Sequence, residues 1–225
     1  KSGSKNKTSS PTIQRKPIQK EKKDECPICL DALPMDAGKF IRFACCGKGI
    51  HPGCDKQLVQ TKSKNIREYC PLCRTEFPRT EEEAMTHVQK WVKKKKAWAQ
   101  CNLGNIYYHG IYGAKKDIKR AFVLYTLAAE QGDANAQSFL GNMYHHGEGT
   151  KPDVQRSLEL FTLAAEQGLA AAQYNLGCMY ASDKGVERSF TTAREWFQKA
   201  AAQGYEDAIA ALKRLDEHVR STVSI

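Results

Sequence analysis

The sequence predicts a mainly α-helical protein, in which a helical solenoid follows a small module held together by metal ions. Two observations predict this fold class. Seven of the nine cysteines and one histidine lie between Cys26 and Cys73, in the short spacings typical of zinc ligands. Three later segments repeat one pattern of Leu-Gly, aromatic and Ala-Ala positions with a period of 36 residues, which is typical of stacked helical repeats.

The charge of the chain does not point to nucleic acid, although it is high. The 225 residues carry a formal net charge of +10, which by itself would suit a polyanionic partner. The surplus lies in two short segments, because residues 1–23 hold eight Lys and Arg against Glu21 alone and a second run covers Lys93–Lys96. We therefore expect no nucleic-acid partner. Residues 1–23 should form a disordered basic tail, as a localisation signal, a polyanion contact or a solvated linker.

The sequence also lacks the signals of membrane proteins and secreted proteins. No apolar run approaches the roughly 18 residues that a membrane-spanning helix needs, and the first residues lack the apolar stretch of a secretory signal. Cysteines with metal spacing indicate a reducing compartment. We expect a cytoplasmic or nuclear protein without a membrane partner.

The cysteine-rich module covers residues 24–79. Its eight candidate ligands are Cys26, Cys29, Cys45, Cys46, His51, Cys54, Cys70 and Cys73. Zinc takes four nitrogen or sulfur ligands, and two residues between paired cysteines let both thiolates face one ion, so eight ligands predict two Zn²⁺ ions. A module of about 50 residues is too small for a stable apolar core, and metal binding should supply most of its folding free energy.

This module resembles a RING finger of the ubiquitin-ligase type, through Cys-Pro-Ile-Cys-Leu at residues 26–30 and Cys-Pro-Leu-Cys-Arg at residues 70–74. The resemblance implies a small α+β fold with cross-braced zinc sites, in which the first and third ligand pairs bind one ion and the other two pairs bind the second. The first site would consist of Cys26, Cys29, His51 and Cys54. The second would consist of Cys45, Cys46, Cys70 and Cys73.

Two alternatives for the module stay open. Cys45 and Cys46 are adjacent, so one of them could be a free thiol, with water or a distant side chain completing the second site. The order of the ligands also fits a PHD finger, which reads histone tails. Against a PHD finger, Glu68 stands where such a finger usually has an aromatic residue, and residues 24–79 contain no Trp.

The RING resemblance implies a function in ubiquitin transfer. In ligase RING fingers three apolar positions bind the ubiquitin-conjugating enzyme, and the matching residues are Ile28, Leu58 and Pro71. Arg74 matches the linchpin residue that bridges the conjugating enzyme and ubiquitin. The implied function is an E3 ubiquitin-protein ligase that acts by positioning, without a covalent intermediate and with structural zinc. The alternative is a non-catalytic adaptor, in which the finger only stabilises a protein-binding scaffold.

A connecting helix is predicted over residues 80–96. Thr80 and Glu83 have the spacing of a capping box. Apolar residues then recur every three or four positions and give the helix one apolar face: Met85, Val88, Trp91 and Val92. We expect this face to dock on the first repeat as half a repeat, with Trp91 buried. The competing interpretation is a free linker helix.

Three repeats follow, over residues 97–132, 133–168 and 169–204. Each should hold a helix around Leu-Gly-x-x-Tyr, a glycine-containing loop and a second helix rich in alanine and aromatic residues. Glycine inside a helix costs about 1 kcal/mol relative to alanine, and close packing should compensate this cost. The glycines of the first helices should therefore let a neighbouring helix approach closely: Gly104, Gly141 and Gly177. The glycines that follow the second helices should adopt the left-handed conformation and end these helices: Gly132, Gly168 and Gly204.

This repeated pattern, with A-x-x-x-L-G-x-x-Y and A-A-x-x-G, resembles the Sel1-like repeat family, which is related to tetratricopeptide repeats. The resemblance implies a curved helical scaffold that binds other proteins, so we expect the repeats to recruit a protein substrate. A capping helix should end the solenoid over residues 205–219, with Ile209, Leu212 and Leu215 on its apolar face. Cys101 and Cys178 occupy ordinary repeat positions and should be structural residues.

Overall fold

The computed structural model describes residues 41–42, 49–50, 78–182 and 186–223 of the chain. This part is mainly α-helical, as predicted, and its two short strands pair antiparallel, with Ile41 opposite Ile50. The described elements are β1 (Ile41–Arg42), β2 (Gly49–Ile50), α2 (Glu81–Lys93), α3 (Ala97–His109), α4 (Ile118–Glu130), α5 (Ala134–His146), α6 (Val154–Glu166), α7 (Ala170–Ala181), α8 (Phe190–Ala201) and α9 (Glu206–Val223). Among these helices, none combines the length and the apolar character that a bilayer crossing requires.

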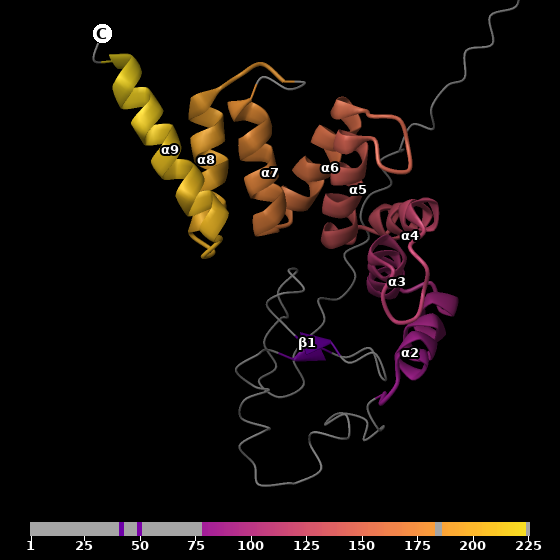
Figure 1. Cartoon of the computed structure of the whole chain (residues 1–225). Helices are drawn as coiled ribbons and strands as arrows, with labels where there is room; N and C mark the ends of the chain where they lie inside the picture. The colour runs from indigo at the N-terminus through magenta and orange to yellow at the C-terminus, as the bar shows by residue number, and fades with distance from the viewer. Residues whose placement is uncertain (1–40, 43–48, 51–77, 183–185, 224–225) are drawn as a thin grey trace, which may run out of the picture.

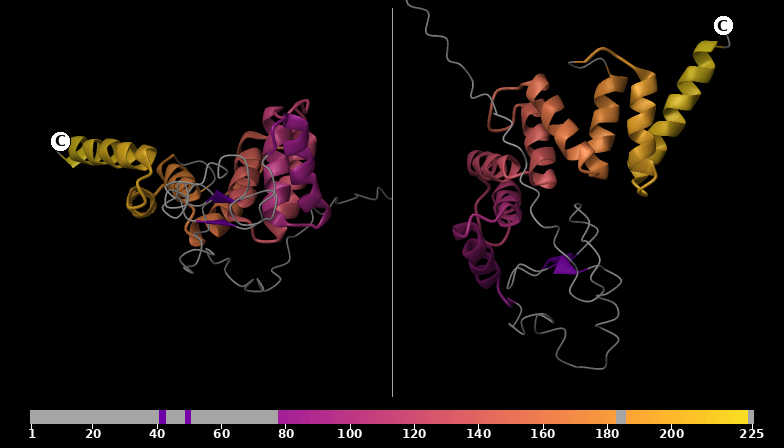
Figure 2. Two further views of the ribbon diagram at one scale, coloured as in Figure 1. Left: turned by 90° about the horizontal axis from the view of Figure 1, so that it is seen from below. Right: turned by 180° about the vertical axis from the view of Figure 1, so that it is seen from behind.

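The helices follow one another in space in the order of the chain (Figure 1). α3 packs against α4, α5 against α6 and α7 against α8, and each of these pairs also packs against the first helix that follows it. Views from below and from behind show the same row, with α2 at one end and α9 at the other (Figure 2). Packing between chain neighbours is characteristic of a solenoid, so the predicted repeat architecture is confirmed.

Polar caps and glycines set the ends of the second helices. Asp117, Asp153 and Ser189 each accept a hydrogen bond from the backbone N–H three residues later, at 3.0, 3.0 and 3.2 Å. The glycine that follows each of these helices has a positive φ: 89° at Gly132, 92° at Gly168 and 81° at Gly204. No neighbouring atom lies within 4 Å of a Cβ placed there, so the left-handed backbone, not a lack of space, favours glycine.

The glycines inside the first helices admit an aromatic ring from the second helix of the same pair. In each case a Cβ atom placed on the glycine would nearly touch the ring. The pairs are Gly104 with Tyr125 (2.7 Å), Gly141 with Phe161 (3.0 Å) and Gly177 with Phe197 (2.5 Å). The predicted close approach of a neighbouring helix is therefore confirmed.

Pairs of glutamines join the helices as well. In each pair, a glutamine that follows a second helix donates from its amide nitrogen to the side-chain oxygen of a buried glutamine on the first helix. The pairs are Gln131 with Gln100, Gln167 with Gln137 and Gln203 with Gln173, at 2.5, 2.6 and 2.8 Å. Gln137 and Gln173 in turn donate to backbone carbonyl oxygens of the preceding repeat, at 3.4 and 3.2 Å. The second and third repeats are each linked in this way to the repeat before them.

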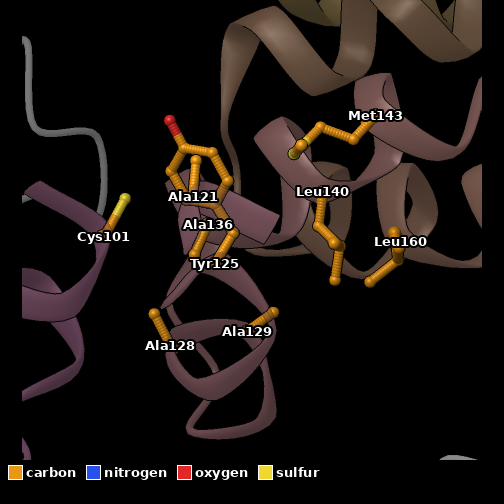
Figure 3. Close-up of a cluster of buried hydrophobic side chains, with 9 residues drawn as sticks. All are labelled: Cys101, Ala121, Tyr125, Ala128, Ala129, Ala136, Leu140, Met143 and Leu160. Carbon is orange, nitrogen blue, oxygen red and sulfur yellow. The ribbon is translucent and has the colours of Figure 1, made fainter. Parts of the chain in front are cut away.

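The core between the first two repeats draws side chains from α3, α4, α5 and α6 (Figure 3). Tyr125 lies at its centre, and its hydroxyl donates to Oδ1 of Asn105 at 2.8 Å. Small alanines around the ring allow the helices to approach one another closely. The buried members are Cys101, Ala121, Tyr125, Ala128, Ala129, Ala136, Leu140, Met143 and Leu160.

α2 packs against α3 at the start of the solenoid. Val88 is 9% exposed and forms a cluster with Leu103 and Ile106, and Met85 and Val92 lie at the edge of this cluster. Trp91 contributes less than expected, because it is only partly buried and lies outside that cluster, beside Trp98 at 6.0 Å between ring centroids. The docking face of α2 is therefore mainly aliphatic.

The N-terminus of α2 differs in one detail from the predicted capping box. The hydroxyl of Thr80 accepts from the N–H of Glu83 at 3.2 Å, as predicted. The Glu83 carboxylate accepts from the N–H of Arg79 at 2.8 Å instead of the N–H of Thr80. Both side chains still satisfy backbone donors at this helix end.

The apolar face predicted for the last helix is confirmed at Leu215 and wrong at Ile209. Up to residue 217, the buried residues of α9 are Ala208, Ala211 and Leu215, whereas Ile209 is 41% exposed and Leu212 only partly buried. The small alanines let α9 approach α8 closely, and this rotates the contact face away from Ile209. α9 also continues past residue 219, to Val223.

Candidate partner-binding groove

A groove opens where the first helices of successive pairs meet. Its volume is about 710 Å³, and its lining comes from α5, α7, α8 and α9 together with Phe161 of α6 and the segment before α8. We call this recess the α5–α9 groove. Its most distinctive side chains are Tyr174, Cys178, Arg188, Phe190 and Arg214.

An aromatic stack lies along the α5–α9 groove. Tyr174 of α7 lies between Phe197 and Tyr205, with ring centroids 5.7 and 5.4 Å away. The hydrogen bond between its hydroxyl and the thiol of Cys178, together with burial, raises the pKa of Tyr174 to about 12. The Tyr174 ring is therefore a neutral, firmly packed part of the groove near pH 7.

Neither described cysteine is activated as a nucleophile. Burial raises the pKa of the Cys178 thiol, and the hydrogen bond to Tyr174 and the charge of Arg214 lower it by less. Burial also raises the pKa of Cys101, with a further contribution from the nearby Asp133 carboxylate. Because the reactive form of cysteine is the thiolate, both residues have the structural character that the sequence predicts.

The charged groups of the groove are of one sign. Arg188 and Arg214 contribute guanidinium groups, and the described lining residues include no carboxylate. The guanidinium of Arg188 lies 5.5 Å from the centroid of the Phe190 ring. Asp216 on α9 forms an ion pair with Arg194 of α8, with a nitrogen–oxygen distance of 2.6 Å. The described lining of the α5–α9 groove thus presents two arginines beside aromatic rings, and the Asp207 carboxylate outside the lining acts on Tyr174 and Cys178 with the opposite sign.

A second recess, between α2 and the loop that follows α3, differs in its charge. Its volume is about 870 Å³, and its lining includes Glu81 and Glu82 as well as Lys115 and Lys116. In the same loop, Tyr112 adopts a positive φ of 53°. Because charges of both signs lie together in this recess, it offers a weaker electrostatic signature than the α5–α9 groove.

The site residues predicted from the cysteine-rich segment lie outside the described residues. This applies to the eight zinc ligands, to Ile28, Leu58 and Pro71 as contacts of the conjugating enzyme, and to Arg74. The third glycine loop, with Asp183, also lies outside them. Within residues 78–182 and 186–223, no cluster of His, Cys, Asp and Glu could hold a metal ion.

The sequence does not predict the α5–α9 groove as a binding site. Alignment of the repeats carries a usable signal for one of its lining residues, because Asn142, Cys178 and Arg214 follow one another at intervals of 36 residues. Equivalent repeat positions lie side by side in a solenoid, so Arg214 could have been placed beside Cys178. No such signal exists for Arg188, which lies in the segment before α8.

Comparisons with known proteins agree with the helical repeat fold. The family model described as Sel1 repeat matches residues 99–133, 134–169 and 170–205. A Sel1 repeat protein from Oxalobacter formigenes has a similar crystal structure, with 27% identity and a TM-score of 0.53, over 62% of this chain and 64% of that chain. The structure of c5321, a protective antigen of uropathogenic Escherichia coli strains with an SLR fold, has 30% identity and a TM-score of 0.57, over 61% of this chain and 29% of that chain.

These comparisons concern the fold of the helical repeat region. The chain spans less than two thirds of the length of either of these structures. A comparison with curated proteins gave no match. The matched repeats begin one or two residues later than the predicted boundaries of 97, 133 and 169. Residues 99–205 of the chain are therefore three Sel1 repeats.

Proposed function

We propose that the Sel1 repeats form a protein-interaction scaffold and that the α5–α9 groove is where the recruited protein docks. The observation that carries this proposal is the groove itself, in which Tyr174, Phe190 and Arg214 line one recess across successive helices. Aromatic and arginine side chains are the groups that most often dominate binding energy at protein interfaces. Docking needs no chemistry from the repeats, which agrees with two thiols whose pKa is raised.

For the cysteine-rich segment, we propose a RING finger, which would make the chain an E3 ubiquitin-protein ligase. The sequence supports this proposal through eight thiol and imidazole ligands in RING order and through Ile28, Pro71 and Arg74 at matching positions. Sulfur and nitrogen donors suit Zn²⁺, and four protein ligands per ion leave no open position for a reacting water. Zinc would therefore hold the finger together without taking part in the reaction.

The proposed ligase accelerates transfer by bringing two reactants together. Ile28, Leu58 and Pro71 bind the conjugating enzyme that carries ubiquitin as a thioester, and Arg74 bridges the two. A lysine amine of the substrate held on the repeats attacks the thioester carbonyl, the amide bond forms, and the thiolate of the conjugating enzyme leaves. The packing of α2 on α3 supports this arrangement, because α2 begins directly after the finger segment.

A photo-crosslinking amino acid tests the docking site. Benzoylphenylalanine at Asn175, which lines the groove, should crosslink to a partner in cells. The same group at Gln155, which is exposed on α6 outside the groove, should not. Tyr174→Ala in the Asn175 variant should remove the crosslink while circular dichroism shows intact helices. Equal crosslinking from both positions would contradict the docking site.

An autoubiquitination assay with a panel of conjugating enzymes tests the ligase. Ile28→Ala should abolish or strongly reduce transfer while the chain retains two zinc ions, because the change removes interface area and not a ligand. Arg74→Ala should reduce transfer and leave binding of the conjugating enzyme nearly intact. A zinc-loaded wild-type chain that is inactive with every enzyme of the panel would favour the non-catalytic adaptor.

A further inference from the structure

The chemistry of the α5–α9 groove indicates what kind of segment it binds, an inference that rests on the proposed docking site. Both charged residues of the described lining, Arg188 and Arg214, are exposed cations, and His145 and His146 add imidazoles at the end of α5. Residues 97–223 contain 13 Lys and Arg and 14 Asp and Glu. The positive lining is therefore a local feature of the groove and not a consequence of the overall charge.

Arg214 is available to a ligand. Arg214 lines the groove together with Tyr174 and Cys178, and its charge is close enough to these two residues to act on the pKa of both groups in the lowering direction. Within the described part of the chain, the ion pair of α9 joins Asp216 to Arg194, and none involves Arg214. Asp207 also affects Tyr174 but does not line the groove. A guanidinium without a carboxylate partner suits a carboxylate ligand, which it can bind through two parallel hydrogen bonds.

The rest of the lining suits a polypeptide. The Phe190 ring, beneath Arg188, offers an apolar surface for one side chain. Asn142 and Asn175 place carboxamide groups in the lining, and a carboxamide can both donate to and accept from a peptide backbone. Cation, apolar surface and amides thus lie in one recess.

We propose that the α5–α9 groove binds an acidic segment of the partner protein, in which Asp or Glu residues flank one aromatic or large aliphatic residue. The carboxylates accept hydrogen bonds from Arg214 and Arg188, and the apolar side chain packs on Phe190. Opposite charge across the interface then selects acidic partners over neutral and basic ones. The recess beside α2 lacks this selectivity, because its lining mixes Glu81 and Glu82 with lysines.

A single-stranded nucleic acid would meet the same cations, but the groove fits it less well. Binding of nucleic acid depends on neutralising several successive phosphates, and the described lining supplies two arginines. The repeats as a whole hold no surplus of positive charge that would continue such a track. An acidic peptide needs only one or two charge contacts.

Fluorescence anisotropy with the full chain tests the proposal. The probe is a labelled peptide pool with a Glu-x-Glu core, in which x is randomised over apolar residues, and its twin pool has a Gln-x-Gln core. Residues 1–23 hold eight cations and will attract the acidic pool by themselves. The informative comparison is therefore between Arg214→Gln and the control Lys213→Gln. The control also removes one positive charge from α9, at the adjacent exposed position outside the groove.

We expect the wild type to bind the acidic pool more tightly than its twin, Arg214→Gln to weaken this binding about tenfold, and Lys213→Gln to change it less than about twofold. Equal effects of the two substitutions would overturn the inference, as would equal affinity for the two pools. If Tyr174→Ala then abolished binding of both pools, the docking site would stand and only the acidic class would fail. An Arg214-dependent preference for a single-stranded oligonucleotide over the acidic pool would also overturn it.

Discussion

Replacing Gly177 with alanine should destabilise the third repeat, because the Phe197 ring occupies the space that the new methyl group needs. The added Cβ would lie 2.5 Å from both Cδ1 and Cε1 of Phe197, far inside van der Waals contact. Phe197 is 3% exposed and packs against the Tyr174 ring, with 5.7 Å between centroids. The ring cannot swing into solvent, so α7 and α8 have to move apart.

Two opposing effects determine how much a glycine-to-alanine substitution changes the free energy of unfolding. Alanine stabilises a helix interior by about 1 kcal/mol relative to glycine, whereas overpacking a core costs about 1–3 kcal/mol. At Gly141 the Cβ would lie 3.0 Å from Phe161, so a small shift suffices and the two effects nearly cancel. At Gly177 the steric effect is larger, and we expect the free energy of unfolding to fall by about 1–2 kcal/mol.

Urea unfolding followed by far-UV circular dichroism measures the effect. The loss should be largest for Gly177→Ala, intermediate for Gly104→Ala and smallest for Gly141→Ala, in the order of the distances from Cβ to ring. In a Phe197→Ala background the ring is absent, and Gly177→Ala should become stabilising. A Gly177→Ala variant as stable as the wild type, or one that still destabilises without the ring, would refute the close approach.

Three further predictions concern the glutamines, the thiols and zinc. Gln173→Leu should lower the free energy of unfolding by about 1–3 kcal/mol, because it removes both hydrogen bonds of a buried side chain, the one to the carbonyl of Ala165 and the one from the amide of Gln203. Gln198→Leu at an exposed site of α8 should change it little, and urea unfolding measures both. Burial raises the pKa of Cys101, so the folded chain holds its proton more tightly than the unfolded chain does. The resulting stabilisation is complete below the unfolded pKa of about 8.5 and is lost as pH rises above it, and Cys101→Ala should flatten this alkaline fall in unfolding titrations. Chelation should release two zinc ions, counted by elemental analysis, and leave the circular dichroism of the repeats unchanged.

The repeat architecture could be predicted because its signals are local. A left-handed turn and a close helix contact both exclude most side chains, so Gly132, Gly177 and their equivalents reveal the geometry from sequence alone. N-terminal caps are local in the same sense, since Thr80 meets its backbone partner within three residues. Such features need no knowledge of the tertiary structure.

The features that sequence analysis missed depend on partners distant in the chain. α9 has two overlapping candidate contact faces, one that starts at Ala208 and one that starts at Ile209. Hydropathy favours burial of Ile209, whereas close packing against α8 favours burial of the smaller Ala208. In the sequence, nothing distinguishes Gln173 from other polar helix residues, because its partner Gln203 lies 30 residues away in the chain. Arg188 and Arg214 come together in one groove only through the stacking of helices.

The stacking also makes the spacing between the proposed finger and the groove testable. One full repeat, α3 and α4, separates α2 from the first helix that lines the groove. A second copy of residues 134–169 inserted before residue 134 should lengthen this distance and fold, because the carbonyl of Ala165 can replace that of Ala129 as the acceptor of the glutamine that follows. Binding of the Glu-x-Glu pool and autoubiquitination should persist, since the groove and the finger keep their residues. Transfer to a lysine on a groove-bound acidic peptide should fall if the repeats set the distance between substrate and thioester, and unchanged transfer would show that they do not.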